Sequence, residues 1–347
     1  MTVITPTIER APALPEGRGP LSRFVLDAFS RPARRLGRAP AIDVGDGLGD
    51  DDLHLALYLC YELHYRSFAG VDDRWEWEPS LLGFRQSLED RFEAALLAAV
   101  PPVGEVDPER AEVEVRALLE RGSGPSLSSF LLEHGTVEQF CEFAVHRSAY
   151  QLKEADPHTW GIPRLSGPAK AALVEIQADE YGGGRQEAMH STLFANVLEA
   201  VGLDSTYGAY LDLLPGTTLA TVNLISLFGL HRRWRGALMG HLAVFEMTSV
   251  VPMGRYAAMV DRLALPPAAR AFYDVHVMAD AHHEVVAAEG LIGGLARTEP
   301  DLVAGIVFGA AALMATEERF AAHLLESWAA GGTSLRAHHL DRRTTHG

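Results

Sequence analysis

Residues 272–289 form an uninterrupted helical stretch that limits the folds open to this chain. The stretch contains neither proline nor glycine, so we expect a single helix. At about 100° per residue, His276, Asp280 and His283 fall within roughly a 60° arc of an otherwise apolar face. Burying two imidazoles and a carboxylate is costly without a partner, and iron, manganese or zinc would provide one. The alternative is a solvated helix face.

The rest of the chain shows the same type of pattern from residue 21 onward. Apolar residues recur with a period near 3.6 residues, and we find neither a convincing alternating strand pattern nor a paired hairpin turn. The sequence therefore predicts an all-α bundle. The predicted helical segments are 21–29, 50–69, 79–99, 107–121, 126–133, 137–155, 165–201, 204–214, 218–249, 260–265, 267–289 and 301–328.

Both ends of the chain differ from this helical body. The first 20 residues contain four prolines and no periodicity, and the last residues are polar. His338, His339 and His346 could scavenge metal, but we expect a disordered end. The predicted parts are a flexible or wrapping arm (1–20), an N-terminal helical extension (21–125), a core (126–330) and a polar tail (331–347).

Composition excludes several classes of protein. The balance of 46 Asp+Glu against 30 Lys+Arg gives a net charge of −16, which argues against nucleic acid or an anionic membrane as partner. With only Cys60 and Cys141, neither a disulfide framework nor a cysteine-rich zinc site is expected. The N-terminus lacks signal-peptide features, and we expect no apolar run that approaches the roughly 18 residues of a membrane span. We expect a soluble, cytoplasmic protein.

The acids and histidines of the apolar helices are the candidates for chemistry. The chain has no GxSxG, Walker A or HExxH motif. Glu187–His190 is an ExxH pair and Asp280–His283 a DxxH pair. Two such pairs, with a carboxylate from each of two further helices, are the bundle pattern for two iron or manganese ions.

Two further carboxylates could complete that pattern. Glu246 is isolated within a strongly apolar run, which favours a functional role. Glu154 lies near a predicted helix C-terminus, where an acid is unfavourable, so solvent exposure is an equal alternative for it. Just beyond the Glu246 helix, Arg255 and Tyr256 are candidates for holding a substrate carboxylate.

Three motifs together carry a resemblance to a known family. The run EIQADEYGGG at 175–184, the isolated Phe245–Glu246 and the HxxxDxxH pattern at 276–283 resemble the haem-oxygenase-like diiron oxidases. These proteins, often labelled iron-containing redox enzymes, are related to haem oxygenase and thiaminase-like proteins. The resemblance covers about 140–290 and implies a seven-helix core holding two irons. The implied ligands are Glu154, Glu180, His190, Glu246, His276, Asp280 and His283.

The resemblance and the spacing disagree about the partner of His190. Spacing favours Glu187, whereas the resemblance implies Glu180. We follow the resemblance, because the glycines at 182–184 can distort the helix and bring Glu180 round; Glu187 stays as the alternative. The same glycines fit the family's flexible metal-bearing helix. Some family members have Asp at the position of His276.

The resemblance implies a non-haem diiron oxidase or oxygenase with O2 as co-substrate. Such enzymes act through a peroxo-diferric species in N-hydroxylation or oxidative C–C cleavage of small substrates in specialised metabolism. We expect two iron ions, with manganese open, a small-molecule substrate, an external electron donor and a homodimer. The alternatives are a metal-free thiaminase-like hydrolase or small-molecule-binding protein, which needs a cysteine in the pocket, and a ferritin-like iron-binding protein.

Overall fold

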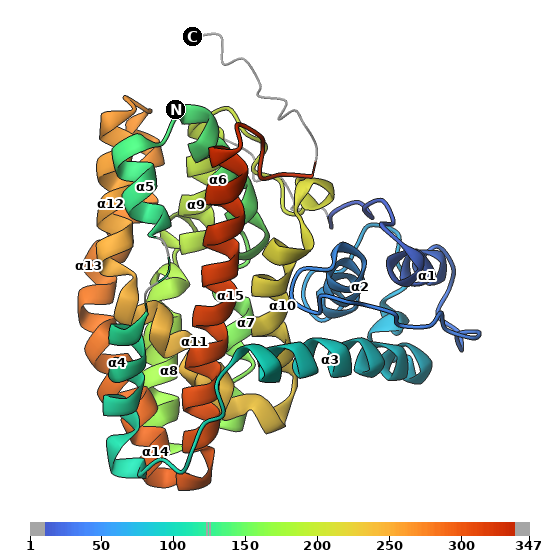
Figure 1. The fold of residues 1–347 in the computed structure, drawn as a ribbon, viewed down its shortest axis with the longest axis horizontal. Helices are drawn as coiled ribbons and strands as arrows, with labels where there is room; N and C mark the ends of the chain where they lie inside the picture. Colours follow the sequence, from blue (N-terminus) through green and yellow to red (C-terminus); the bar gives the residue numbers. More distant parts are fainter. Residues whose placement is uncertain (1–10, 123, 125, 337–347) are drawn as a thin grey trace.

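The computed structural model describes residues 11–122, 124 and 126–336. In this part of the chain all regular structure is helical and no strand occurs, so the prediction of an all-α fold is confirmed. Figure 1 shows upright helices packed into a bundle, with α1, α2 and α3 on one side. Those three are α1 (Pro20–Phe29), α2 (Asp51–Glu62) and α3 (Pro79–Ala99).

The remaining helices form the bundle, in which α11 and α15 lie against each other. Their backbones approach closely, because a side chain at Gly240 or Gly309 would collide with the backbone of the facing helix. A π-helical stretch, Val286–Gly293, extends α13. The bundle helices are α4 (Ala111–Arg121), α5 (Leu127–His134), α6 (Val137–Gln151), α7 (Asp156–Thr159), α8 (Gly167–Glu180), α9 (His190–Ala200), α10 (Gly216–Leu230), α11 (Arg235–Thr248), α12 (Val250–Arg262), α13 (Ala271–Val285), α14 (Gly294–Thr298) and α15 (Val303–Ala329).

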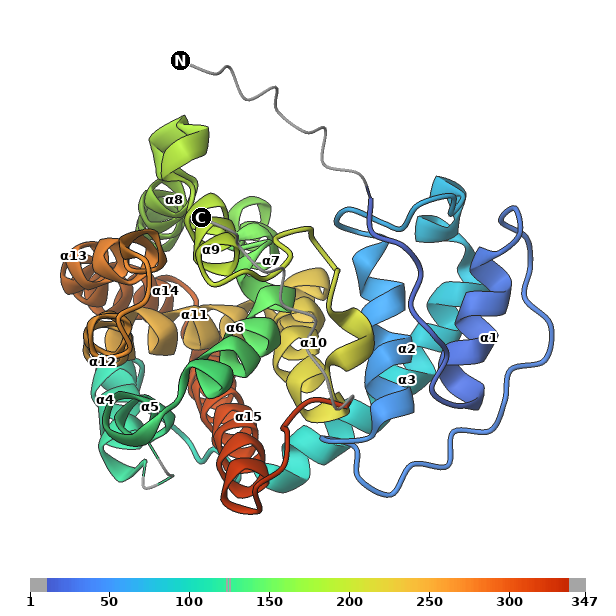
Figure 2. The same ribbon diagram turned by 90° about the horizontal axis from the view of Figure 1, so that it is seen from above.

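Helix α2 joins the N-terminal helices to the bundle. Asp50 caps its first turn by accepting from the backbone of Asp52 and Leu53. Every residue of α2 from Leu53 to Glu62 is buried, as expected of a helix that is covered on several faces. The helix packs against α1, α3 and α10, and Figure 2 shows it between α1 and α10.

The predicted domain boundary at residue 125 stays a prediction. Helix α4 lies before that boundary, in the predicted extension, but it packs against α15 and the π-helical stretch. Helices α1 and α3 pack around α2, whereas α4 packs on the bundle.

Several predicted helices are interrupted by turns. The predicted helix 165–201 divides because α8 ends at Glu180 and Gly182 has a φ of +62°, with backbone from residue 188 packed against it. The segment 204–214 is mostly turn, with Gly208 at a φ of +77°. The other corrections are that 50–69 ends at Glu62, 137–155 ends at Gln151, 218–249 breaks at 231–234 and 260–265 is the end of α12.

Helix α15 is longer and more apolar than the sequence analysis allowed. The stretch Pro300–Ala329 has the length and composition to cross a membrane, with a mean hydropathy of 1.3, and α11 with α12 passes the same test as a bent pair. The prediction that no apolar run approaches such a length is therefore wrong. In this structure α15 packs along α11 and α10, and its buried residues belong to the core.

The described parts of the two chain ends pack onto the helices. The carbonyl of Pro12 accepts from the backbone of Ala69 at 2.8 Å, in keeping with a wrapping arm. Ser334 is buried and donates to Glu142 at 2.6 Å. The prediction of a disordered tail is therefore wrong for 331–336. The predicted metal-scavenging residues His338, His339 and His346 lie outside the described residues.

Candidate metal centre

Seven buried acids and histidines meet inside the bundle. Each is at most 8% exposed. Glu154 comes from the turn after α6, Glu180 is the last residue of α8, and His190 is the first residue of α9. Helix α11 contributes Glu246, and one face of α13 contributes three residues. The residues from α13 are His276, Asp280 and His283.

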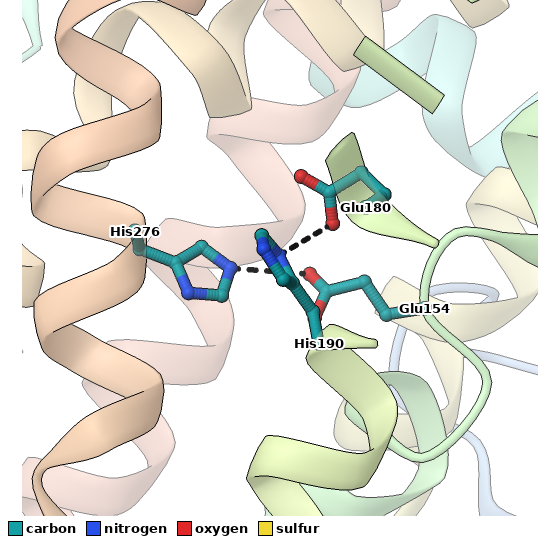
Figure 3. A group of neighbouring side chains, drawn as sticks. All are labelled: Glu154, Glu180, His190 and His276. Atoms are coloured by element: carbon teal, nitrogen blue, oxygen red, sulfur yellow. Dashed lines mark ion pairs between the residues drawn. The ribbon is translucent and has the colours of Figure 1, made fainter. Parts of the chain in front are cut away.

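These residues form two sets of four with one member in common. Within each set, one ligand-type atom from every residue lies within 4.8 Å of the others. The first group is Glu154, Glu180, His190 and His276, and the second group is Glu180, Glu246, Asp280 and His283. Glu180 therefore stands between the two groups. Figure 3 shows the four side chains of the first group directed toward one another.

In the first group, an imidazole nitrogen and a carboxylate oxygen face each other at short range. His190 Nδ1 lies 2.8 Å from Glu180 Oε2, yet neither atom makes a hydrogen bond. The Nδ1 atom of His276 lies 2.8 Å from the carbonyl of Phe272. If that nitrogen carries the proton of a neutral imidazole, Nε2 has a free lone pair. Nε2 lies 3.8 Å from Glu154 Oε1.

In the second group, His283 is held from both sides of its ring. Its Nδ1 lies 3.2 Å from Glu246 Oε2 and 3.5 Å from Asp280 Oδ1. Its Nε2 lies 3.0 Å from Asp179 Oδ2, so a proton shared with Asp179 leaves Nδ1 to face the group. The hydroxyl of Ser249 donates to Asp280 Oδ2, while Asp280 Oδ1 has no hydrogen-bond partner.

Burial and mutual charge shift the pKa values of the carboxylates. Burial raises the pKa of Glu246 to about 7; the charges of Glu180 and Asp280 add to this, and His283 opposes it. Burial also raises the pKa of Glu154. For Glu180, burial acts in the same direction, but the neighbouring histidines outweigh it and its pKa lies below the ordinary value.

The pKa values of the three clustered histidines are raised, so these side chains keep their protons. Burial acts to lower each pKa, but the carboxylates outweigh it. Glu154 and its neighbours raise the pKa of His276 to about 10, and Asp280 and Glu246 raise that of His283 to about 11. Glu180 likewise raises the pKa of His190. Without metal, protonated histidines therefore balance the buried carboxylates.

A cavity of about 470 Å³ opens against these residues. Five of the seven line it, together with the aromatic rings of Phe143, Phe194 and Tyr256 among others. Among the described residues that line the cavity, the only lysine or arginine is Arg147. It makes a two-pronged ion pair with Glu317, at 2.8 and 2.7 Å.

Comparison with known proteins agrees with this arrangement. A model of a family described as iron-containing redox enzymes matches residues 141–318, just over half of the chain. The chain belongs to this haem-oxygenase-like family. The match makes it an oxidoreductase and implies iron, and the matched segment contains all seven clustered residues while leaving out α1–α5.

One relative of this family member is the nitrosourea synthase of Streptomyces achromogenes subsp. streptozoticus. The two are 28% identical over 160 residues, which is 45% of this chain and 34% of the relative. The chain thus matches about a third of that protein's length.

The structure shows where the remaining candidate residues from the sequence lie. Beside His190 it places Glu180, whereas Glu187 is exposed in a short turn. Tyr256 lines the cavity, and burial raises its pKa to about 12. Arg255 is not among the lining residues; it donates to Ser126 and Ser128, both at 3.3 Å.

Supporting residues of the centre were missed by the sequence analysis. Asp179, beside His283, is next to Glu180 in the chain, and such adjacent acids at a helix end were a usable signal. The amide nitrogen of Gln151, in the orientation that pairs both its polar ends, donates to the two oxygens of Glu154 at 2.9 and 2.8 Å. Ser249 and Gln151 carry no distinguishing sequence pattern.

Proposed function

We propose that this family member is a non-haem diiron oxidase or oxygenase that uses O2 to oxidise a small organic substrate. The observation that carries the proposal is the pair of buried four-residue groups that share Glu180. Two adjacent sets of ligand-type atoms with a carboxylate between them fit two metal ions better than one.

The residues present fit iron in their donor chemistry and their charge. Carboxylate oxygens and imidazole nitrogens suit iron and manganese. Glu154, Glu180, Glu246 and Asp280 carry four negative charges when ionised, which two divalent ions would balance. Three buried atoms also make no hydrogen bond: Glu180 Oε2 and His190 Nδ1, which lie 2.8 Å apart as an ion pair, and Asp280 Oδ1. Buried polar atoms need a partner, and a cation would supply one.

The protein's own groups would orient the ligands and keep the site dry. The first group would hold one ion and the second group the other, with Glu180 between them. Bound iron would supply the electrons that reduce O2 beside the substrate. The carbonyl of Phe272 and the carboxylate of Asp179 keep the outer ring nitrogens of His276 and His283 occupied, so the inner nitrogens face the centre. Aromatic side chains around the cavity exclude water.

The cavity supports a small organic substrate. Its size of about 470 Å³ lies within the usual range for small-molecule sites. Arg147 and Glu317 lie in its wall as an ion pair, and a substrate with a carboxylate and an ammonium group could exchange partners with that pair. Similarity to a nitrosourea synthase supports an oxidation in specialised metabolism. N-hydroxylation or C–C cleavage, the reaction intermediate, an external electron donor, a homodimer and a cytoplasmic location stay predictions.

The metal-free alternative finds no support at the cavity. A hydrolase of that kind needs a nucleophilic cysteine beside its substrate. Cys60 and Cys141 are both buried and neither lines the cavity. Burial raises the pKa of Cys60 to about 12, which removes thiolate character at neutral pH.

Anaerobic titration with ferrous iron, followed by rapid mixing with O2, tests the proposal. We expect about two irons per chain and a transient visible absorption after mixing. Glu246→Gln should lose one of the two irons and the transient, whereas Glu187→Gln, a substitution of an exposed glutamate nearby, should retain both irons and the transient. Iron uptake no higher than that of an unrelated protein would overturn the dinuclear assignment. Iron uptake and oxidation with no organic substrate consumed in a screen would point to the iron-binding alternative.

A further inference from the structure

Glu154 lies in a different backbone setting from the other six clustered residues. The others are part of an α-helix, three of them on α13. Glu154 lies in the turn between the end of α6 at Gln151 and the start of α7 at Asp156. A repeating helical ladder therefore does not fix its backbone, and its position depends on what holds this turn.

The residue immediately before Glu154 is a buried lysine bound to α2. Lys153 Nζ lies 2.8 Å from Glu62 Oε2, and the two side chains are 1% and 0% exposed. The ammonium group also lies over the rings of Tyr58 and Tyr65, at 4.9 and 4.4 Å. The other oxygen of Glu62 accepts from the hydroxyl of Tyr207 at 2.7 Å. Both partners of this ion pair are thus held on several sides.

A second contact binds the residue before that. Arg66, in the turn after α2, donates from Nη2 to the carbonyl of Leu152 at 3.1 Å. Its guanidinium lies 4.5 Å from the centre of the Tyr207 ring. The end of α2 and the turn after it therefore contact both residues that precede Glu154. Glu62 binds the side chain of Lys153, and Arg66 binds the backbone of Leu152.

Glu62 and Arg66 come from a part of the chain outside the family match, which begins at residue 141. A buried ion pair is weak support for stability, but its directional contacts can fix one arrangement of the groups around it. Here the arrangement it fixes is the turn that carries a member of the first group.

We propose that the end of α2 and the turn after it position Glu154 to bind the iron of the first group. Glu62 and Arg66 are positioning residues in this arrangement: they act through Lys153 and Leu152 and touch neither metal nor substrate. The N-terminal helical region is thereby a component of the metal centre. This inference rests on the proposed function, since it assigns the residues that complete one of the two iron sites.

The test is anaerobic titration of the full-length chain with ferrous iron alone, comparing wild type with Glu62→Gln. The substitution keeps the shape but removes the charge that holds Lys153. We expect iron binding at the first group to weaken by about 10–100-fold, the effect of losing a support of a metal ligand. Binding at the second group should be unchanged, so the variant should retain one tightly bound iron. A general loss of stability would affect both irons.

A matched control is available on α3. Glu89 is as buried as Glu62 and is paired with Arg85 and His231, at 3.2 and 2.9 Å, but none of these residues lies beside a clustered acid or histidine. Glu89→Gln should leave both irons bound as in wild type. Thermal unfolding of each metal-free variant verifies that the chains compared are folded.

If Glu62→Gln does not fold, Arg66→Met decides the question, because Arg66 is only partly buried and methionine retains its apolar stem. It should weaken the first iron selectively as well. Two irons bound with wild-type affinity in a folded Glu62→Gln or Arg66→Met chain would overturn the positioning role. A wild-type chain that binds no iron would instead refute the proposed function, so the two failures are distinguishable.

Discussion

Three residues of the second group lie within the helices α11 and α13, whereas three residues of the first group lie where helices end. Glu246, Asp280 and His283 have their backbones fixed by the regular hydrogen bonds of their helices. Glu154, Glu180 and His190 instead depend on turns: the one between α6 and α7, and the glycine-rich one between α8 and α9. The two groups thus have similar side chains on backbones of different kinds.

The comparison teaches that similar ligand sets need different support. The second group lies mainly on the packed helices α11 and α13, and Ser249 and Asp179 contact its side chains. The first group needs the α2 contacts at Lys153, the amide of Gln151 at Glu154, and a break at Gly182 that allows Glu180 and His190 to face each other. We therefore expect the first group to bind iron more weakly and to lose it first when the fold is perturbed.

Substitution of Glu180, the residue shared by the two groups, should have the largest effect on iron binding. It should weaken both irons alike. Glu180→Gln takes a charged oxygen from both groups at once, so both irons should bind more weakly, by at least about 100-fold, the upper end for loss of a mere support. Ferrous-iron titration measures this, with Glu187→Gln as the control. Retention of one iron at wild-type affinity would show that Glu180 serves only one group.

Substitutions confined to one group should separate the two irons. Glu246→Gln affects only the second group and His190→Gln only the first, so each variant should keep about one iron per chain. Iron analysis after removal of weakly bound metal measures the remaining content. If both substitutions removed both irons, the groups would be a single cooperative site and the comparison between them would fail.

The pH dependence should differ between the metal-free and iron-bound chains. In the metal-free chain the pKa of His276 is raised to about 10 and that of His283 to about 11, against about 6.5 when unfolded. The folded chain holds more protons between these values, so the stabilisation is complete below about pH 6.5 and is lost as the pH rises through about 10. Iron must displace the same protons, so its affinity rises with pH.

Two measurements check these opposite signs. Denaturant unfolding of the metal-free chain should give a free energy of unfolding that falls from about pH 6.5 to 9.5. Ferrous-iron affinity between about pH 6.5 and 8 should rise by up to tenfold per unit for each proton displaced. Since His276 serves the first group and His283 the second, the rise should appear for both irons. An affinity independent of pH would mean that these histidines are not ligands.

Local sequence signals predicted the features that depend on a single helix, namely its bounds and the residues that share one of its faces. The helix over 79–99 has the predicted bounds because Glu78 caps it and Pro79 occupies its first position. In the same way, the spacing of His276, Asp280 and His283 on one face needs only helical geometry. The break after Glu180 was missed as a helix end because periodicity carries no information on the sign of φ, although the glycines were recognised as a distortion.

What periodicity could not supply is contact between distant segments. The spacing rule preferred Glu187 for His190, because it assumes that one helix continues through both. Lys153, the residue before Glu154, pairs with Glu62, which is 91 residues away in sequence, and no local pattern relates two such positions. Here the family resemblance supplied Glu154 and Glu180 as candidates, and the structure brings both into the cluster.

The smallest predicted effect concerns a residue that supports the second group from outside. Asp179 Oδ2 lies 3.0 Å from His283 Nε2, but its side chain is 57% exposed. Asp179→Asn keeps an oxygen that can accept a hydrogen bond and removes only the charge. We therefore expect iron binding at the second group to weaken by about 10-fold, the lower end for loss of such a support, while the first group is unchanged.

The matched control for Asp179 lies one turn earlier on α8. Glu175 Oε1 is also 3.0 Å from a histidine ring nitrogen, that of the exposed His282, so the pair reproduces the contact without reaching the cluster. Glu175→Gln should leave both irons unchanged in a ferrous-iron titration. Weakening of the first iron by Asp179→Asn would mean that the two groups communicate through Glu180, and their separate support by turn and helix would no longer explain their affinities.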